Sequence, residues 1–358
     1  MAKGANVDKL AAEFADELDN LGVRVANLEK KADNVKITGN ARYRYYDSDL
    51  DGNYNKLRSR IWFNGQVNED WSYTGMIQNE QNFDNNAGDE DTKFQRAYDE
   101  GKLGGLQVTA GRYNAFFGNG NIYDTRADGV EVAYGKDVKV RAFAGKAADG
   151  VTVLPTIGKY VSDFEGISTD NGGKYFGGEV STEIAKGLNL TAGYIKFKDM
   201  GEGGDEAIAT VPSGIDNGIW HVGAEYAIGN VALSAMYLKG DLSYDDEPGV
   251  NDAIDEALDD DGIVIGLSYK GAKAAEAGSY GIWAKYYDQG AQTYVAHTTD
   301  ANTFGLTGFK GYGVGVDYTV AKNIVAGVAY YDTESKLADK VDWDLDDQRL
   351  LAEINFYF

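Results

Sequence analysis

Two histidines and the absence of cysteine limit the chemistry open to this chain of 358 residues. Without Cys there is no thiolate nucleophile, no disulfide and no cysteine-based zinc site. His221 follows Trp220 in an alternating run, and His297 precedes two threonines, so neither belongs to a recognisable catalytic triad. We therefore expect no enzyme, with His221 on the wall or rim of the fold and His297 in solvent.

Basic side chains recur at every second position in two early segments, which places them on one face of extended strands. Each unpaired charge would cost several kcal/mol in a dry core, whereas facing water costs nothing comparable. Some of these arginines could instead pair locally or face a subunit interface, and the alternation around Arg96 and Arg112 is ambiguous. The candidate basic residues are Arg42, Arg44, Arg58, Arg60, Arg96, Arg112 and Arg349.

A segment rich in Gly and Asn, residues 111–129, could set acidic groups against this basic row. Its glycines and asparagines permit tight bends, and Phe116 and Phe117 could anchor it to an inner wall. Carboxylates facing arginines across water would create a transverse field that orients dipolar solutes and selects weakly among ions. The candidate residues are Tyr113, Asn114, Phe116, Phe117, Asp124, Asp128 and Glu131.

A second acidic segment, residues 241–261, holds ten acids and no base. Carboxylate oxygens suit hard divalent cations, but the spacing and central glycine of an EF-hand are missing. Specific calcium binding, diffuse attraction of cations or bridging to lipopolysaccharide, and simple solvation all stay open, and we expect no other cofactor. The candidate acids are Asp241, Asp245, Asp246, Glu247, Asp259, Asp260 and Asp261, and residues 251–258 could form a short helix.

The composition excludes several classes of protein. Thirty-four basic and 57 acidic side chains give a net charge of −23, which repels nucleic acid. No run of about 18 apolar residues could cross a bilayer as a helix. Residues 1–4 lack the regions of a secretory signal peptide, so the chain is either cytosolic or cut from a longer precursor.

From Val35 to Phe358 the hydrophobic period is two, which predicts antiparallel strands. We count about sixteen runs, an even number as in bacterial single-chain barrels. Their connectors alternate between very short and long, so the two kinds should lie at opposite ends. The long connectors are residues 47–56, 82–92, 113–127, 146–173, 198–217, 240–261, 288–310 and 332–346.

Tyrosines stand at the ends of many of these runs, at alternate positions that point to the same face as the aliphatic side chains. Two aromatic rings at opposite rims of one apolar surface are expected where a barrel meets both membrane interfaces, although an ordinary β-sandwich also favours Tyr. The opposite face carries hydrated side chains, and a barrel of about sixteen strands is wide enough for an aqueous channel. The sequence therefore predicts a pore. The tyrosines are Tyr134, Tyr194, Tyr226, Tyr237, Tyr269, Tyr286, Tyr318 and Tyr330.

Residues 7–35 follow a different period, with apolar side chains alternating at intervals of three and four. This heptad pattern predicts a self-associating coiled coil about 40 Å long at about 1.5 Å per residue. A single amphipathic helix lying on the domain or plugging it is the alternative. The residues of the predicted trimerisation seam are Val7, Ala11, Phe14, Leu18, Leu21, Val25 and Leu28.

The heptads end in Leu28-Glu29-Lys30-Lys31 and run into Asp33-Asn34-Val35-Lys36-Ile37-Thr38-Gly39. On these residues the chain resembles, over essentially its whole length, the major outer-membrane porins of the OmpM type, from Firmicutes that possess an outer membrane. The resemblance implies a trimeric general porin with a periplasmic stalk, and it likens residues 111–129 to the loop that narrows general porins. Family members also carry a signal peptide and a surface-layer-homology domain, through which the cell-wall polymer would be bound; both are missing here.

The last strand resembles the signal read by the outer-membrane assembly machinery, with Ile354, Phe356 and the terminal Phe358 as its residues. We thus expect residues 1–34 to form the stalk and residues 35–358 an all-β transmembrane barrel. The expected function is passive diffusion of small hydrophilic solutes and ions through a homotrimer in outer-membrane lipid and lipopolysaccharide. The full-length protein would also tether the membrane to the wall. A closed-barrel tether or adhesin, or a substrate-specific anion channel, are the alternatives.

Overall fold

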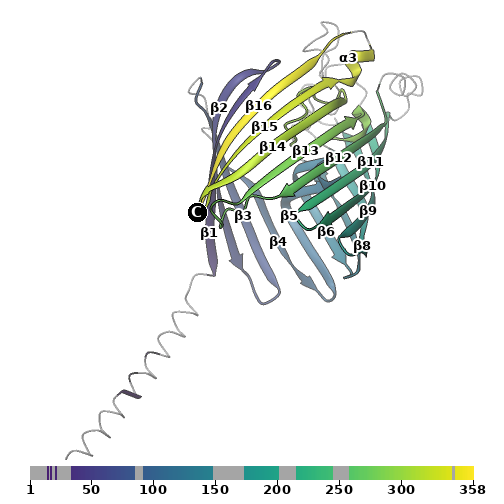
Figure 1. The fold of residues 1–358 in the computed structure, drawn as a ribbon. Coiled ribbons are helices and arrows are strands. Elements are labelled where there is room, and N and C mark those ends of the chain that lie inside the picture. Colours follow the sequence, from purple (N-terminus) through teal and green to yellow (C-terminus); the bar gives the residue numbers. More distant parts are fainter. Residues whose placement is uncertain are drawn as a thin grey trace, which may run out of the picture.

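Sixteen antiparallel strands form one closed barrel in the computed structural model, which describes residues 14, 15, 17, 21, 34–84, 92–147, 173–200, 215–244, 258–340 and 343–358 (Figure 1). Each strand pairs with its neighbours in sequence, and β1 pairs with β16 to close the ring. The strands are β1 (Val35–Ser48), β2 (Gly52–Gln66), β3 (Trp71–Asn82), β4 (Lys93–Leu103), β5 (Leu106–Phe117), β6 (Tyr123–Tyr134), β7 (Val138–Ala147), β8 (Lys174–Ala185), β9 (Leu188–Met200), β10 (Ile215–Ile228), β11 (Val231–Tyr244), β12 (Asp261–Lys270), β13 (Tyr280–Gln289), β14 (Phe309–Ala321), β15 (Ile324–Ser335) and β16 (Asp346–Tyr357).

Within the described residues, three short helical turns join the strands: η1 (Gly118–Gly120), η3 (Ala291–Thr293) and α3 (Lys336–Lys340). Among the described residues, no helix is long and apolar enough to cross a membrane. The predicted number of strands is confirmed. β2 and β6 begin inside the connectors predicted as residues 47–56 and 113–127, because their hairpins extend further.

Period-two alternation gives the barrel one apolar and one polar face. Residues opposite each other on paired strands point to the same side, and the outward set includes Val222, Ile265 and Val316, all substantially exposed. Tyrosines of the same parity, such as Tyr237 and Tyr318, lie near opposite rims of this surface. The outer wall thus has the apolar band flanked by aromatic residues that membrane barrels require.

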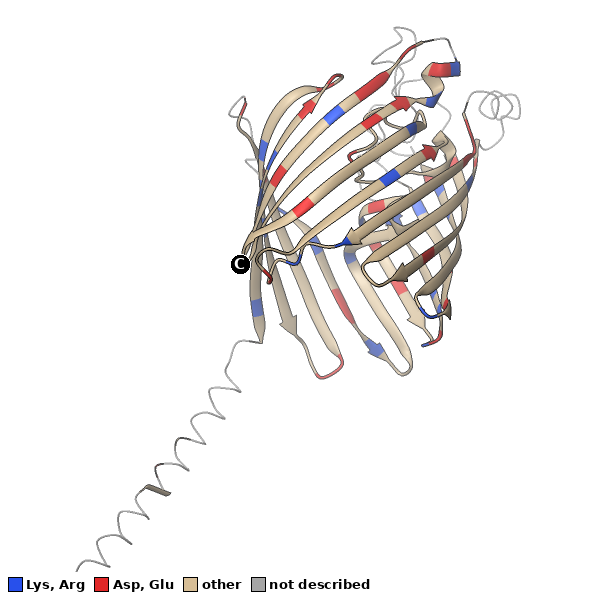
Figure 2. Cartoon of the chain, viewed as in Figure 1, with Lys and Arg blue, Asp and Glu red and all other residues tan. Residues whose placement is uncertain are grey.

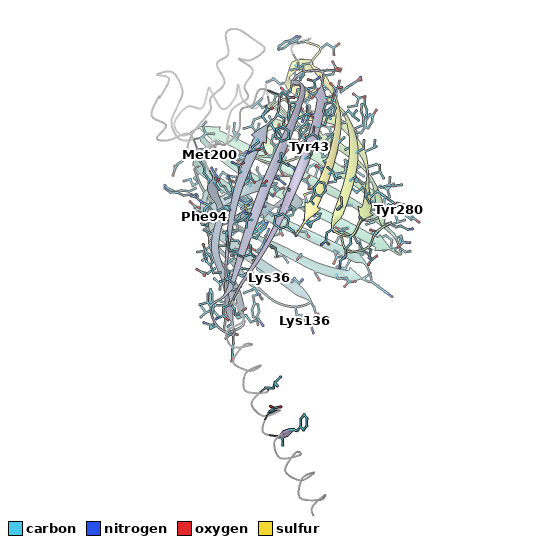
Figure 3. All side chains as sticks on the ribbon, turned by 90° about the vertical axis from the view of Figure 1, so that its left-hand side faces the viewer. Lys36, Tyr43, Phe94, Lys136, Met200 and Tyr280 are labelled. Atoms are coloured by element: carbon cyan, nitrogen blue, oxygen red, sulfur yellow. The ribbon has the colours of Figure 1, made fainter. Side chains whose placement is uncertain are left out.

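Short turns and long connectors lie at opposite ends of the barrel, as predicted (Figure 1). Met200 at one end and Lys136 at the other mark them in Figure 3, which faces the wall that contains β1 to β4. The connector predicted as residues 47–56 is wrong: Ser48 pairs with Gly52, so only a three-residue turn joins β1 to β2. The alternation in this segment continues closer to the turn than its polar residues indicated.

The predicted stalk lies almost wholly outside the described residues. Of its seam, Phe14 and Leu21 are described, both in helical conformation and both 59% exposed. The other seam residues, Val7, Ala11, Leu18, Val25 and Leu28, lie outside the described residues, so the division into residues 1–34 and 35–358 stays a prediction.

Candidate functional site

The hairpin of β5 and β6 leaves the barrel wall near its tip. Pairing of β5 with β4 ends at Arg112, and pairing of β6 with β7 ends at Ala127, whereas the two strands stay paired with each other up to Phe117 and Tyr123. Gly111, where the hairpin leaves the wall, has a φ of 122°, a backbone conformation that residues other than glycine rarely adopt. The end of the hairpin, residues 113–126, is therefore free to turn into the lumen.

Aromatic packing holds one face of this hairpin against the inner wall. The Phe117 ring is fully buried and stacks on Phe143 of β7, with the ring centroids 4.1 Å apart. Tyr123 packs against Phe197 of β9 at 5.7 Å, and the Tyr113 hydroxyl lies 3.1 Å from that of Tyr175 on β8. The hairpin thus covers the inside of β7 to β9.

A charged network beneath the hairpin supports it. The Arg141 guanidinium donates to the Phe116 carbonyl at 2.9 Å and lies over the Phe117 ring at 5.6 Å. It also forms ion pairs with Glu131 at 3.4 Å and Glu179 at 3.3 Å. His221 lies 3.1 Å from Glu179, which places this histidine on the inner wall. The sequence analysis missed Arg141 and Glu179, although both lie at inward positions of their strands.

The connector between β13 and β14, residues 290–308, also folds into the barrel and meets the hairpin. The Val295 amide donates to the Ile122 carbonyl at 2.9 Å, and the Asp124 amide donates to the Ala296 carbonyl at 2.8 Å. The Thr298 hydroxyl adds a bond to the Asp124 carboxylate at 2.7 Å. Hairpin and connector therefore form one continuous element inside the lumen.

Gln292 fixes the start of this connector to the upper wall. Its side-chain oxygen accepts from the Leu242 amide at 2.8 Å, and its carbonyl accepts from the Asn217 side chain at 3.0 Å. Gly240 leaves the necessary room, because a Cβ there would lie 2.1 Å from the Gln292 carbonyl oxygen. The close approach explains the glycine in mid-strand.

The far end of the connector reaches the opposite wall through Asp300. Its carboxylate accepts from the Tyr46 hydroxyl at 2.7 Å and lies 3.2 Å from the Arg44 guanidinium, while its carbonyl accepts from Arg349 at 3.3 Å. Charge-assisted bonds of this kind are stronger than neutral ones. The connector thus spans the lumen from β10 and β11 to β1 and β16, a role that the sequence analysis did not assign to it.

The wall left uncovered is that of β1 to β4, and it carries the basic row. Arg42 and Arg58 lie opposite each other in register, and Arg60 donates to Gln78 at 2.7 Å. No carboxylate of the described residues forms an ion pair with Arg58, although Glu80 lies directly opposite it on β3; Arg42, Arg60 and Arg44 also act on Arg58 electrostatically. Arg96 hydrogen-bonds Asn114 on the hairpin.

Asp124 faces this wall from the hairpin. Its carboxylate acts electrostatically on Arg60 and Arg96. The structure therefore brings four of the predicted basic residues, Arg42, Arg58, Arg60 and Arg96, to one side of the remaining passage. Asp124 lies across from them on the hairpin, whereas the unpredicted Asp300 reaches the β1 side of this same wall, where it pairs with Arg44.

Other predicted site residues take different positions. Arg112 and Asp128 pair with each other on the outer face at 2.6 Å, since they lie opposite the outward residues Ala97 and Lys146. Glu131 contacts Arg141, and Arg349 forms ion pairs with Asp51 and Asp347 at the rim. These four residues do not belong to the opposed rows.

The predicted loop and anchor also need correction. Tyr113, Asn114, Phe116, Phe117, Asp124, Asp128 and Glu131 lie in β5 or β6, and only residues 118–122 join the two strands. Phe116 is 44% exposed and does not pack on the wall, because it has the opposite parity to the buried Phe117.

His297 is not solvated, contrary to the sequence-based expectation. Its ring stacks on Tyr294 at 4.6 Å and lies edge-on to Phe309 at 5.7 Å, and its Nε2 atom is buried without a hydrogen-bond partner. Burial lowers the pKa of His297 to about 4, so this imidazole is neutral near pH 7.

The acidic segment does not gather a metal site within the described residues. Asp259 forms ion pairs with Lys336 and Lys340 at 3.0 and 2.7 Å, and Asp260 pairs with Lys239 at 2.5 Å. Asp241 lies within β11 and Asp261 begins β12, and no group of three candidate ligands occurs among the described residues. Asp245, Asp246, Glu247 and most of the predicted helix 251–258 lie outside them.

The barrel resembles several solved outer-membrane proteins. The anion-selective porin of Comamonas acidovorans is 14% identical, with a TM-score of 0.57 over 90% of this chain and 99% of that one. Salmonella typhi OmpF, solved with daunomycin, is 15% identical (TM-score 0.56; 90% and 97%), and a loop-deletion mutant of Vibrio cholerae OmpT is 16% identical (0.56; 90% and 99%).

No family model and no curated protein matches the chain. At such low identities the resemblance concerns the fold, which is that of the sixteen-stranded outer-membrane porins.

Proposed function

We propose that this chain is a general diffusion porin of the bacterial outer membrane, passing small hydrophilic solutes and ions without catalysis. The observation that carries the proposal is the charged passage between Arg42, Arg58 and Arg60 on the wall and Asp124 on the inward hairpin. The guanidinium groups of Arg58 and Arg60, which form no ion pair among the described residues, need water inside a membrane barrel, and opposed charges across water orient dipolar solutes.

Single-channel recording in planar bilayers under a salt gradient tests this proposal. Arg58→Gln with Arg60→Gln should shift the reversal potential toward cations, because it removes two positive charges from the passage. Asp124→Asn should shift it toward anions. A matched control is Arg112→Gln, which removes an outward-facing charge and should leave the potential unchanged. A protein that inserts without conducting would support the alternative of a closed tether or adhesin.

A substrate-specific anion channel is the second candidate, because Arg58 forms no ion pair among the described residues. Flux of neutral and anionic solutes of equal size separates the two. A large preference for the anion would favour the specific channel over general diffusion.

The outer face of β2 to β4 supports assembly into trimers. Ser59 and Asn79 lie opposite each other on the outer side at mid-height, and Asp99 lies on the same face of β4. Polar and charged groups facing lipid are destabilising, so a second protein surface is the better neighbour. The chain has no Cys, so Ser59→Cys should cross-link subunits, whereas Ala142→Cys on β7 should not.

The OmpM-type relationship, a periplasmic coiled-coil stalk of residues 1–34 and tethering to the cell wall belong to the same proposal. They rest on the heptads and on the sequence around residues 28–39. Removing residues 1–34 should leave conductance intact but lower trimer stability on heating, if the heptads associate.

A further inference from the structure

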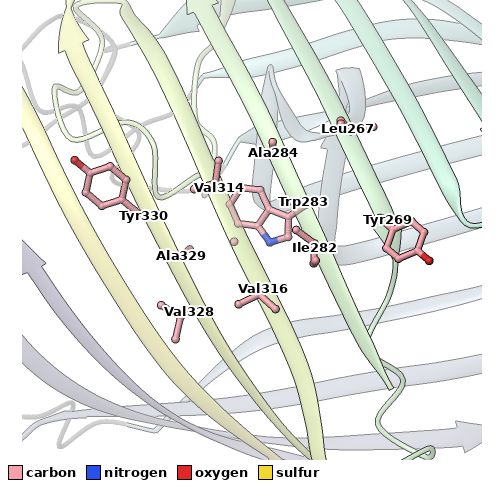
Figure 4. A pocket seen from close by; sticks show the side chains of 11 residues that line it. Leu267, Tyr269, Ile282, Trp283, Ala284, Val314, Val316, Val328, Ala329 and Tyr330 are labelled. Carbon is pink, nitrogen blue, oxygen red and sulfur yellow. The ribbon is translucent and has the colours of Figure 1, made fainter. Parts of the chain in front are cut away.

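Trp283 of β13 places an indole on the inner face of the barrel. Its neighbours Ile282 and Ala284 point outward and line a groove on the outer wall, so the alternation of the strand turns Trp283 to the lumen (Figure 4). The indole extends over β14, where a Cβ on Gly315 would lie 2.6 Å from two of its ring atoms. Only a glycine lets the ring approach the backbone so closely. One face of the indole thus rests on the sheet, and the side chain as a whole is only half-buried.

Small residues occupy the inner wall around this indole. Gly313 follows Gly315 on the same face of β14 and is covered from β15 by the ring of Tyr331, whose centroid lies 5.9 Å from that of Trp283. The side chains at the neighbouring inward positions are too short to cover the open face of the indole. These positions are Ser234, Gly266, Ser268, Gly281, Gly327 and Ala329.

Two side chains of opposite charge flank the indole, and neither forms an ion pair or a hydrogen bond among the described residues. Lys285 follows Trp283 by two residues on the same face, is exposed, and leans over β12, with its Cγ 3.7 Å from where a Cβ on Gly266 would lie. Asp317 lies on the inner face of β14 and leans over β15, with its Oδ1 2.5 Å from where a Cβ on Gly327 would lie. Figure 2 shows how few charged residues the middle of β12 to β15 carries, so this pair stands apart.

The indole lies on the short-turn side of the connector that crosses the lumen, residues 290–308. Tyr287, four residues further along the same face of β13, accepts a hydrogen bond from the Thr299 hydroxyl of that connector at 3.4 Å. At about 3.3 Å per residue, Trp283 is about 13 Å closer to the short turns than Tyr287. A solute that moves past the connector toward the short turns therefore comes to the indole next.

An open indole face between a donor and an acceptor suits a sugar. The C–H face of a pyranose ring is apolar and can cover an aromatic ring, while its hydroxyls both donate and accept. The Lys285 ammonium only donates and the Asp317 carboxylate only accepts, so hydroxyls can satisfy both. The strands over which the two side chains lean, β12 and β15, are three strand spacings apart, or about 14 Å. That separation is too wide for the two charges of one amino acid and corresponds to two or three linked sugar units.

We propose that Trp283, Lys285 and Asp317 form a binding site for a short neutral oligosaccharide inside the barrel. One pyranose ring lies on the indole, and its neighbours' hydroxyls accept from the Lys285 ammonium and donate to the Asp317 carboxylate. Glu353, which acts on Asp317 electrostatically, is itself paired with Arg44 at 2.6 Å, so Asp317 is the acceptor on this side. The inference rests on the proposed function, because the sugar reaches the site through the open lumen, and it adds a preferred class of solute to it.

Titration calorimetry of the detergent-purified full chain tests the site. The probes are maltotriose, a polyethylene glycol of the same hydrodynamic radius, and free tryptophan as an aromatic zwitterion. Trp283→Ala should weaken maltotriose binding about tenfold, because it removes the apolar surface that the sugar covers, whereas Trp283→Phe should keep most of the affinity. Lys285→Met and Asp317→Ala should each weaken it several-fold. Trp62→Ala is the matched control, since Trp62 faces the lumen from β2, and it should bind maltotriose as the parent does.

Unchanged binding by Trp283→Ala, an equal loss in Trp62→Ala, or equal binding of the polyethylene glycol overturns the proposal. Tighter binding of tryptophan than of maltotriose overturns the choice of a sugar. If Trp283→Ala does not fold, Lys285→Met and Asp317→Ala carry the same test. Calorimetry does not require conduction, so a silent barrel that binds maltotriose through Trp283 would refute the channel alone, whereas a conducting barrel that binds no maltotriose would refute only the sugar site.

Discussion

Replacing Phe117 with Ala removes the ring that fixes the inward hairpin to the wall. Phe117 is fully buried and contacts Phe143, Tyr175 and the Arg141 guanidinium. The barrel wall does not depend on these contacts, because β5 and β6 keep their wall pairing below Arg112 and Ala127. The loss therefore weakens docking of the hairpin rather than folding of the barrel.

The magnitude follows from the burial. Truncating a buried Phe to Ala costs about 3–5 kcal/mol. Since about 1.4 kcal/mol corresponds to a factor of ten, the docking equilibrium should shift by roughly a hundredfold to a few thousandfold toward the undocked hairpin. The bonds between Asp124 and the β13–β14 connector remain and oppose this shift.

Single-channel recording measures the effect. Phe117→Ala should raise the mean conductance and the open-channel current noise, because the hairpin would leave its position intermittently. Phe116→Ala is the matched control, since Phe116 is 44% exposed and packs on no wall residue of the aromatic cluster. Heat-modifiable migration on gels would verify that both barrels are intact.

The reasoning fails if Phe117→Ala, in an intact barrel, has the conductance and noise of the parent. In that case the aromatic cluster would not hold the hairpin, or the hairpin would not limit the current. Equal increases in both variants would instead point to loss of side-chain volume.

Four further outcomes are expected. Asp300→Asn should speed amide exchange across residues 290–308, since bonds to charged groups contribute about 1.5–3 kcal/mol; exchange equal to that of the parent would contradict the assigned tie to Arg44 and Tyr46. Burial lowers the pKa of His297 to about 4 when the connector of residues 290–308 is docked. The free energy of docking should therefore become less favourable by about 3 kcal/mol as the pH falls from about 6.5 to 4. Amide exchange of the connector measures this pH dependence, and His297→Phe should flatten it. Burial of Asp259 opposes its ionisation, but Lys340 and Lys336 outweigh this effect and lower the pKa of the Asp259 carboxyl. Protonation of Asp259 would break its ion pairs with these two lysines of α3. We therefore expect α3 to resist proteolysis at neutral pH and to become sensitive as the pH falls through the lowered pKa. Gly240→Ala should displace Gln292 and raise conductance, whereas Gly271→Ala, with open space around it, should change nothing.

The barrel itself could be predicted from the sequence because the alternation of apolar and polar residues within each strand defines the two faces of that strand. Val314, Val316 and Tyr318 alternate with Gly or Asp, and this pattern alone fixes which side meets the apolar environment. The basic row on β1 and β2 could be predicted for the same reason. Residues of one parity on a strand must share a face, whatever the rest of the chain does.

The inward elements could be predicted only in part. The resemblance to the narrowing loop of general porins implied that residues 111–129 turn inward, but alternation could not show whether Phe116 or Phe117 meets the wall. The connector of residues 290–308 has no alternating pattern, and its position depends on partners such as Arg44 and Asn217 that are distant in sequence. Such contacts leave no local signal.

The bond between Asp124 and Ala296 has a consequence for the order of assembly. The eight strands β6 to β13 separate its two ends along the chain, so the narrow passage cannot exist until β13 and β14 are in place. Contacts so distant in sequence form late, after the local hairpins. A barrel interrupted during insertion would hold the hairpin without its partner, and the pore of such an intermediate would be wider than that of the finished protein.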